Sequence, residues 1–325
     1  MRQEGGKESK KVWFGDYLFR NEYSDVLADF QDIGVRLGFS VVSSTGSPEA
    51  ICIVNFYLRD VITLVRSPAL RRLNLRMHLI TEPSVTLPIL NLKFWTLLRL
   101  VRVELGSDGQ NVVEKPHRCE PGPDNFDRLD RAVIVNANKF SWVKGEQYTL
   151  RRQVVSECRS VDTYGSGWNG TVTVTLLKNA AEMLRAAVLP SRFHFGARHA
   201  FSKPHRYLGS TPDKIVTLSN YKVCLVIENS RELLTEKLID AWMAGCIPVY
   251  VGPDLSSRGI PDSAYIRAEP TLASIEAAIE RAFYVDWDSY QSELNAWLST
   301  PEFTRKWGLE SAWSIALHPI LQSNS

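Results

Sequence analysis

The sequence predicts an α/β protein of two domains, each built around a largely parallel sheet. Short runs of mostly apolar residues, as at 51–57 and 223–227, are typical of strands that are buried on both faces. Longer segments with helical spacing alternate with these runs, which is the order of βαβ units. At 325 residues, the chain is also long enough for two cores of ordinary size.

The first domain is predicted to span residues 1–128. Strands are expected at 12–19, 39–43, 51–57 and 77–81, and helices at about 24–37 and 61–72. Val26, Leu27, Phe30, Ile33 and Val35 roughly follow helical spacing in the first of these helices. The stretch 106–124 is rich in Gly, Pro and charge, and it marks the boundary between the domains.

The second domain is predicted to span residues 129–325. Strands are expected at 132–135, 223–227 and 247–251, and helices at 150–158, 179–187, 235–244 and 272–283. Thr235 is a candidate N-cap for the third of these helices, and Gly245 is expected to end it, as a C-terminal glycine does.

The composition is that of an ordinary soluble protein. A net charge of +2 and 23% charged residues do not call for a nucleic-acid partner or an acidic membrane. Residues 1–20 lack the apolar run of a signal peptide, and the apolar stretch 85–101 is interrupted by Pro88 and Lys93, which favours core over membrane span. A cytoplasmic protein is expected, with peripheral contact to the inner membrane as an open option.

The cysteines favour the same compartment. The chain has five, at positions 52, 119, 158, 224 and 246, and they are odd in number and scattered. Reduced, buried thiols fit this pattern better than a disulfide framework does.

Polar residues gather at one place in the second domain. Glu228-Asn229-Ser230 directly follows an apolar strand, and Thr235-Glu236-Lys237 opens the next helix. In a strand-loop-helix unit, both segments lie at the carboxyl edge of the sheet, where ligands bind. Free N–H groups at a helix start favour a phosphate there, and Lys237 adds a full positive charge. The residues alone thus predict a site for a nucleotide diphosphate.

This string resembles the signature of glycosyltransferase family 10, the α-1,3/4-fucosyltransferases. Those enzymes carry a Tyr-Lys strand, Glu-Asn-Ser, a short loop, Thr-Glu-Lys and a Pro-Val strand that ends in Gly-Pro, as 221–253 does here. The resemblance covers residues 131–295 and is weak in the first 130. It implies a GT-B architecture, in which two Rossmann-like α/β domains face a cleft. Since no N-terminal membrane helix is evident, the chain looks like a bacterial member.

The resemblance also implies roles for particular residues. Asn229, Glu236 and Lys237 would contact the ribose and diphosphate of the donor, and Arg151 would pair with the diphosphate. The full set expected to bind the nucleotide sugar is Asn138, Lys139, Arg151, Arg152, Glu228, Asn229, Ser230, Thr235, Glu236 and Lys237. Leu233 stands where some members have an aromatic residue, which leaves open a nucleotide sugar other than GDP-fucose.

Glu82 is the candidate general base. It ends the predicted strand 77–81 and precedes Pro83, so it is expected to project from the carboxyl edge of the first domain. Inverting transfer needs a carboxylate that takes the proton of the acceptor hydroxyl.

Three further motifs have competing interpretations. Residues 165–170 match G-x-G-x-x-G, but an NAD fingerprint must open a helix at once, and the β-branched residues 171–175 are predicted not to start one. Asp286-Trp287-Asp288 spells the D-x-D of metal-dependent transferases, yet a surface turn is expected there. The basic stretch 191–212 is either a solvated loop or a source of positive field at the phosphate site, and its spacings do not match a zinc site.

The sequence therefore predicts an inverting transferase that moves L-fucose from GDP-fucose to a hydroxyl of a glycan acceptor, such as an oligosaccharide, lipopolysaccharide or exopolysaccharide precursor. No cofactor or bound metal is expected to be required, although a divalent cation could stimulate. The alternatives are another nucleotide sugar, an NAD-dependent oxidoreductase and a non-catalytic glycan-binding protein.

Overall fold

The computed structural model describes residues 9–20, 24–54, 62–64, 66–73, 76–80, 99–102, 128–141, 144–188, 199–231, 234–301 and 303. The chain divides into two compact units, the first formed by Met1–Glu114 with Arg305–Ser325 and the second by Lys115–Thr304. This division differs from the predicted one, which placed the boundary after residue 128 and residues 305–325 in the second domain. Because residues 103–127 and 304–325 lie outside the described parts, the predicted boundary stays a prediction.

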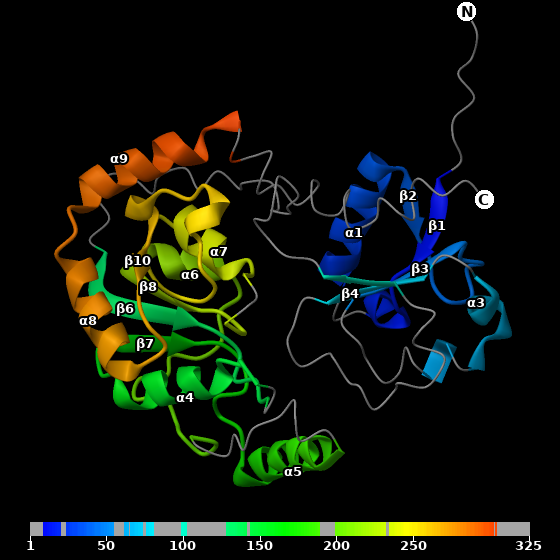
Figure 1. Ribbon diagram of the computed structural model, residues 1–325, viewed down its shortest axis with the longest axis horizontal. Coiled ribbons are helices and arrows are strands. Elements are labelled where there is room, and N and C mark those ends of the chain that lie inside the picture. Colours follow the sequence, from blue (N-terminus) through cyan, green and yellow to red (C-terminus); the bar gives the residue numbers. More distant parts are fainter. Residues whose placement is uncertain are drawn as a thin grey trace, which may run out of the picture. The chain divides into compact units, whose positions relative to one another are not determined.

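Within its described residues, the first unit is built on a five-stranded parallel sheet with strand order β2-β1-β3-β4-β5 (Figure 1). Its strands and helices are β1 (Lys10–Trp13), α1 (Ser24–Leu37), β2 (Phe39–Val41), β3 (Ala50–Val54), α3 (Pro68–Arg72), β4 (Arg76–Ile80) and β5 (Arg99–Arg102). Buried Trp13, Ile51, Leu64 and Leu70 form a core cluster beside the sheet.

Two predicted elements of this unit end earlier than expected. The strand expected at 12–19 stops at Trp13, and Asp16–Phe19 form a 3-10 turn. Asp16 holds that turn, since its carboxylate accepts from Trp13 Nε1 at 2.9 Å and from the Ser44 amide at 2.8 Å. The helix expected at 61–72 is interrupted at Ser67, which caps the new helix α3 and places Pro68 in its first turn.

The second unit contains a five-stranded parallel sheet with strand order β10-β9-β8-β6-β7 in its described part. Its elements are β6 (Leu129–Val135), α4 (Tyr148–Glu157), β7 (Val161–Tyr164), α5 (Val172–Val188), α6 (Lys214–Ser219), β8 (Tyr221–Ile227), α7 (Lys237–Met243), β9 (Ile247–Val251), β10 (Ile266–Arg267), α8 (Leu272–Phe283) and α9 (Trp287–Leu298).

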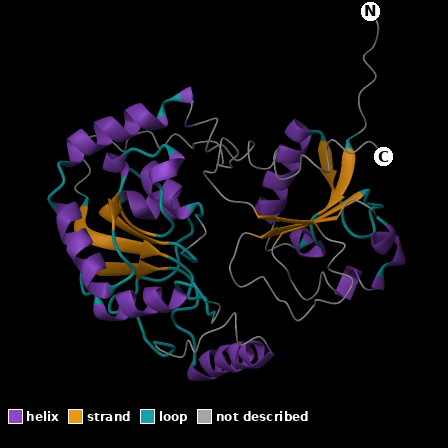
Figure 2. Cartoon of the chain, in the orientation of Figure 1, coloured by secondary structure: helices purple, strands orange, loops and turns teal. Residues whose placement is uncertain are grey.

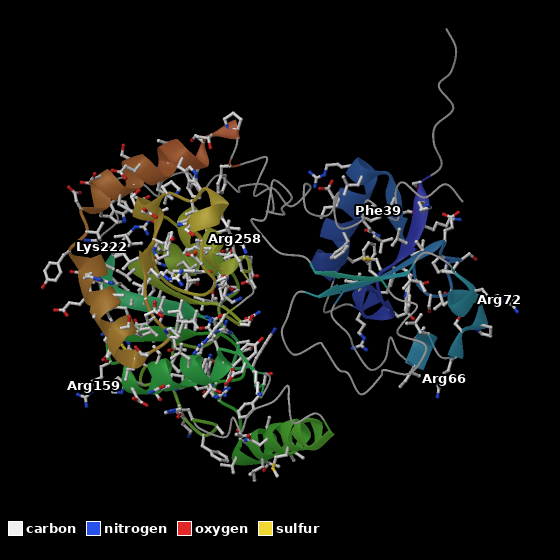
Figure 3. The ribbon with its side chains drawn as sticks, viewed as in Figure 1. Phe39, Arg66, Arg72, Arg159, Lys222 and Arg258 are labelled. Carbon is white, nitrogen blue, oxygen red and sulfur yellow. The ribbon has the colours of Figure 1, made fainter. Side chains whose placement is uncertain are left out.

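Helices cover both faces of the second sheet. Helices α4 and α8 pack together on one face, and α6 and α7 pack together on the other (Figure 2). Since every strand pair is parallel, the carboxyl ends of β6, β7, β8 and β9 meet at one edge. At the opposite end of β8, Lys222 extends toward α8 and donates from Nζ to Phe283 O at 3.1 Å (Figure 3). That end of the sheet is thus tied to a helix, and the carboxyl ends are where loops can present a site.

The glycine predicted to end the helix before β9 has the expected conformation. Helix α7 ends at Met243, and Gly245 has φ +68°, the left-handed region that favours glycine. Cys52, Cys158, Cys224 and Cys246 are buried free thiols, as expected, and Cys119 lies outside the described residues. Among the described helices, none combines the length and apolar character needed to cross a bilayer.

Candidate functional site at the carboxyl edge of the second sheet

A buried carboxylate closes the loop that follows β8. Glu228 is fully buried, and it accepts hydrogen bonds from the amide of Thr235 at 3.0 Å and from its hydroxyl at 2.5 Å. The same hydroxyl oxygen accepts from Lys237 Nζ at 2.7 Å. Thr235 was expected to cap the helix, and that prediction is wrong: α7 begins at Lys237 after Glu236, because Thr235 is engaged with Glu228 instead.

The charges of this loop are unevenly exposed. Lys237 Nζ lies 3.8 Å from a Glu228 oxygen and 3.5 Å from a Glu236 oxygen. The Glu236 side chain is 65% exposed, whereas that of Lys237 is 10% exposed. Burial raises the pKa of the Glu228 carboxyl, although Lys237 and the hydrogen bonds from Thr235 work against it. In this arrangement the Glu228 carboxylate holds the loop through Thr235.

Arg151 links helix α4 to this loop. Its guanidinium is almost fully buried, and it donates from Nε and Nη2 to Ile227 O and from Nη2 to Asn229 Oδ1 at 2.9 Å. The group also lies over the ring of Tyr148, 5.0 Å from its centroid. Burial lowers the pKa of Arg151, yet an arginine keeps its proton in such a site. Arg151 therefore fixes Asn229 and places a positive charge behind the loop.

Arg152, the next residue, points to a different loop. Its Nη1 donates to Lys139 O at 2.7 Å and its Nη2 to Thr149 Oγ1 at 3.0 Å. The guanidinium lies 4.1 Å from the ring centroid of Phe140, and burial lowers its pKa to about 10 although Glu146 acts in the opposite direction. Adjacent arginines at the start of one helix thus hold two loops of the edge, the one after β8 and the one after β6.

Two residues of this site were missed by the sequence reasoning. Glu146 accepts from the amide of Thr149 at 3.0 Å and from its hydroxyl at 2.6 Å, and it pairs through its backbone with Ser230. The Gln147 amide donates to Asn229 O at 3.0 Å. The start of α4 is therefore hydrogen-bonded to the loop after β8. An acid shortly before a predicted helix start is the signal that could have found Glu146.

Asn138 and Lys139 lie at the end of β6, beside the glycine-rich loop. Asn138 Nδ2 donates to Gly167 O at 3.2 Å, and its amide donates to Ser166 O at 2.8 Å. Lys139 is exposed, and its carbonyl is the acceptor for Arg152. Both residues therefore belong to the same edge, and Arg152 of α4 links Lys139 to the helix that also holds the Glu228 loop.

The prediction that residues 171–175 do not start a helix is wrong. Helix α5 begins at Val172, directly after the glycine motif and despite the β-branched residues there. Thr171 makes this possible, because its hydroxyl oxygen accepts from the Val174 amide at 3.4 Å and its carbonyl from the Thr175 amide at 3.1 Å. A strand, the glycine motif and a helix thus follow one another, as in dinucleotide-binding proteins.

The glycines of this motif have structural reasons of their own. Gly165 has φ +126°, and a Cβ there would lie 2.2 Å from Asn136 O. Its amide donates to Gly209 O at 2.9 Å, and its carbonyl accepts from Tyr207 Oη at 2.8 Å. The glycine motif therefore lets the loop after β7 pack closely against Asn136, Tyr207 and Gly209, independently of any ligand.

Other predicted residues fall elsewhere. Glu82, the expected base, lies outside the described residues, as do Leu233 and the basic residues Arg192, His194 and Arg198. The D-x-D string is accounted for structurally, since Asp286 caps α9 by accepting from the amides of Asp288 and Ser289.

The arrangement can hold an anion beside a ribose. Lys237 has three donor hydrogens and uses one on Thr235, while Asn229 and Ser230 present amide and hydroxyl groups on the same loop. Glu236 offers an exposed carboxylate that can accept from sugar hydroxyls. The sequence analysis assigned these residues to donor binding, and that assignment stays a prediction.

Curated relatives match part of the chain. No protein-family model matches it. A mouse (Mus musculus) alpha-(1,3)-fucosyltransferase 4 is 41% identical over 68 residues, 19% of this chain and 16% of the mouse enzyme. A fucosyltransferase-like protein of Arabidopsis thaliana is 32% identical over 83 residues, 25% of this chain and 16% of the plant protein. The matched part is thus about a sixth of the length of each relative.

Solved structures match the chain over its length. An α1,3-fucosyltransferase superimposes with a TM-score of 0.53 at 13% identity, covering 100% of this chain and 94% of that one. An α1,3-fucosyltransferase with GDP gives 0.52 at the same identity and coverage. A trehalose-6-phosphate synthase gives 0.50 at 12% identity, covering 94% of this chain and 80% of that one. The fold is therefore the GT-B fold of glycosyltransferases, as the sequence predicted.

Proposed function

We propose that the chain is an inverting glycosyltransferase that moves L-fucose from GDP-fucose to a hydroxyl of a glycan acceptor. The observation that carries this proposal is the cluster at the carboxyl edge of the second sheet. There, Lys237 and Arg151 flank a loop that presents Asn229 and Glu236, inside the string that resembles α-1,3/4-fucosyltransferases. The partial matches to proteins named as fucosyltransferases support the same class.

The chemistry needs stabilisation of a leaving diphosphate. An oxygen of the acceptor attacks the anomeric carbon, the bond from that carbon to the GDP oxygen breaks, and GDP departs with the electron pair. Lys237 and Arg151 supply positive charge where the leaving group gains negative charge, and their burial in a low-dielectric environment strengthens that effect. Two cations can do this work without a metal held by protein side chains.

In the same proposal, Glu82 is the base that takes the proton of the acceptor hydroxyl. The carboxylate takes the hydroxyl proton as the new carbon–oxygen bond forms, which balances the reaction. Attack from the face opposite the departing GDP inverts the configuration. The support for Glu82 is its place in the sequence, directly after β4 (Arg76–Ile80) and before Pro83.

A second candidate is favoured by one observation. The strand, glycine motif and helix α5 follow one another as in an NAD-binding unit. Against it, such units need an acid about 20 residues after the glycines to bind the ribose. The next described strand is β8, and the acid at its end, Glu228, is buried and engaged with Thr235. Nucleotide diphosphate binding is therefore the better supported function.

Thermal unfolding with GDP, UDP and NAD distinguishes the candidates. We expect a saturable rise in melting temperature with GDP alone, because a ligand that binds only the folded state stabilises it. A rise with UDP alone indicates the same fold with another nucleotide sugar, and a rise with NAD alone overturns the transferase assignment. Turnover of GDP-fucose with a panel of glycan acceptors then tests the reaction. Binding of GDP without turnover on any acceptor supports the non-catalytic glycan-binding protein instead.

A further inference from the structure

Helix α5 presents apolar side chains to solvent. Five of its large apolar residues are between 43% and 67% exposed: Val172, Val174, Leu176, Leu177 and Met183. The helix also lies apart from the sheet of its unit (Figure 1). Soluble proteins seldom leave a contiguous apolar helix face uncovered, and such faces mark interaction sites.

The exposed apolar residues spread over slightly more than half of the helix circumference. At about 100° per residue, Val172, Leu176 and Met183 lie within about 40° of one another, and Leu177 and Val174 lie about 140° and about 200° from Val172. The remaining arc holds Thr175 and Asn179, which are half-buried, and Asn179 Nδ2 donates to Thr175 O at 3.0 Å. The large apolar residues described on α5 are therefore exposed, and its half-buried residues are polar.

The surrounding sequence is strongly basic. From 172 to 212, Lys178, Arg185, Arg192, Arg198, Lys203 and Arg206 stand against a single acid, Glu182. That is a formal charge of +5 in a chain whose total is +2. Three of the six histidines of the chain, at 194, 199 and 205, fall in the same range. Positive charge is therefore concentrated in the sequence of α5 and of the residues that follow it.

Part of this basic range is described, and it mixes apolar with charged groups. Phe201 is 55% exposed, and Lys203 and Arg206 are also exposed. The segment is anchored close to the start of α5, because the amide of Gly165 donates to Gly209 O at 2.9 Å. An exposed aromatic residue and exposed cations that follow an exposed apolar helix in the chain form the pattern of a membrane-surface element.

We propose that α5 and the segment 199–208 bind the surface of an anionic lipid bilayer, with the apolar half of α5 among the acyl chains. With 17 residues that include Lys178, Glu182 and Arg185, α5 is suited to lie in the interface and not to span the bilayer. Lipid headgroups of negative charge would pair with the basic residues.

A second copy of the chain is a poorer occupant. In a symmetric dimer the same surface faces itself, so two patches of charge +5 would be brought together. An anionic bilayer satisfies both the apolar and the charged part of the surface. The inference does not rest on the proposed donor, because binding to lipid is measured without any substrate.

The test is co-sedimentation of the full chain with two kinds of vesicle. One kind is phosphatidylcholine alone, and the other is phosphatidylcholine mixed with phosphatidylglycerol at about 7:3. We expect binding to the mixed vesicles, little binding to neutral ones, and loss on adding salt. The double variant Leu176→Glu with Leu177→Glu should lose about tenfold or more of its partitioning, because both side chains would carry charge into the acyl region. The matched control, Val35→Glu with Val216→Glu, changes exposed apolar residues of α1 and α6 and should bind as the parent does.

Other outcomes overturn the proposal. It is wrong if the parent ignores the anionic vesicles or if the Leu176 and Leu177 double variant binds them unchanged. A parent dimer that this variant dissociates, with no lipid binding, makes α5 an interface between copies. A fall in melting temperature confined to this variant, again with no lipid binding, means that the face is covered by the chain itself.

Discussion

Helices α4 and α5 follow neighbouring strands of one sheet, yet each inverts the usual distribution of side chains. Helix α4 buries Arg151 and Arg152, whereas α5 exposes Leu176 and Leu177. Hydrophobic side chains outside and charged ones inside are both costly, so each inversion needs a cause. For α4 the cause is the pair of loops that its arginines hold. For α5 we infer a lipid surface.

The difference separates two kinds of surface: α4 supports a ligand site inside the unit, and α5 offers a surface to a partner outside it. The polar contacts of α4 lie within the unit and hold loops in place, which is what a nucleotide site requires. The described apolar residues of α5 are instead exposed, and the sequence that follows them is basic. Four predictions test this contrast.

The largest expected effect comes from a residue on neither helix. If α4 serves binding and not proton transfer, Glu82→Gln should lower the transfer rate by about 10²–10⁴, the usual contribution of a positioned base. GDP affinity and melting temperature should stay the same, because the substitution preserves shape. Transfer assays at saturating donor and acceptor, together with GDP calorimetry, measure both. A rate within about threefold of the parent, with chemistry rate-limiting, excludes Glu82 as the base.

Next in size is the contrast between a buried arginine and an exposed leucine. Arg152→Met should lower the free energy of unfolding by about 2–4 kcal/mol, because Lys139 O and Thr149 Oγ1 lose a buried donor. Leu177→Gln should change it by less than about 0.5 kcal/mol. Urea unfolding of both variants checks this. A leucine variant as unstable as the arginine variant contradicts the exposed state of α5.

A matched pair of glycines tests how tightly the edge is packed. A Cβ on Gly252 would lie 2.3 Å from Tyr250 Oη and 2.8 Å from Glu228 Cγ, whereas one on Gly170 would meet only Gly167 O at 3.3 Å. Gly252→Ala should therefore cost about 1–3 kcal/mol of stability. Gly170→Ala, near the start of α5, should cost clearly less. Equal losses in urea unfolding would show that the packing around Glu228 is looser than described.

The smallest expected effect is a pH dependence from Glu228. Its pKa in the folded protein is raised by burial above the usual 4.5, so the native state holds the proton longer than the unfolded state does. The stability it contributes is therefore complete below pH 4.5 and is lost as the pH rises through the folded pKa. Glu228→Gln removes this titration. The stability of the parent minus that of the variant should fall as the pH rises above 4.5, and a difference that grows with pH contradicts the raised pKa.

Much of the fold could be predicted from the sequence because its strands are buried on both faces. The continuous apolar runs gave β3, β8 and β9 to within a few residues, and helix α1 matched its predicted bounds. Ends set by single side chains could not be predicted. Asp16 terminates β1 by binding Trp13 and Ser44, and Ser67 starts a new helix inside a predicted one.

The site shows the same division. The segment 228–237 could be found because its polar residues interrupt two apolar strands. The start of α5 was predicted wrongly because the capping hydroxyl of Thr171 outweighs the poor helix propensity of the β-branched residues after it. The contacts of Glu146 and Gln147 with the loop after β8 join residues more than 80 positions apart, beyond the reach of local patterns.

The central claim is that the carboxyl edge of the second sheet binds the diphosphate of a guanine nucleotide. Calorimetric titration of GDP into the parent and into Arg151→Ala and Lys237→Ala tests it most directly, with Leu177→Gln as the control on α5. We predict saturable binding to the parent and the control, weakened about 10- to 100-fold in each of the other variants, since each loses a charge-assisted contact of about 1.5–3 kcal/mol. For Arg151 the loss is that of the buried charge and of the group that fixes Asn229. The claim is contradicted if the parent does not bind GDP, or if both variants bind it with the parent's affinity.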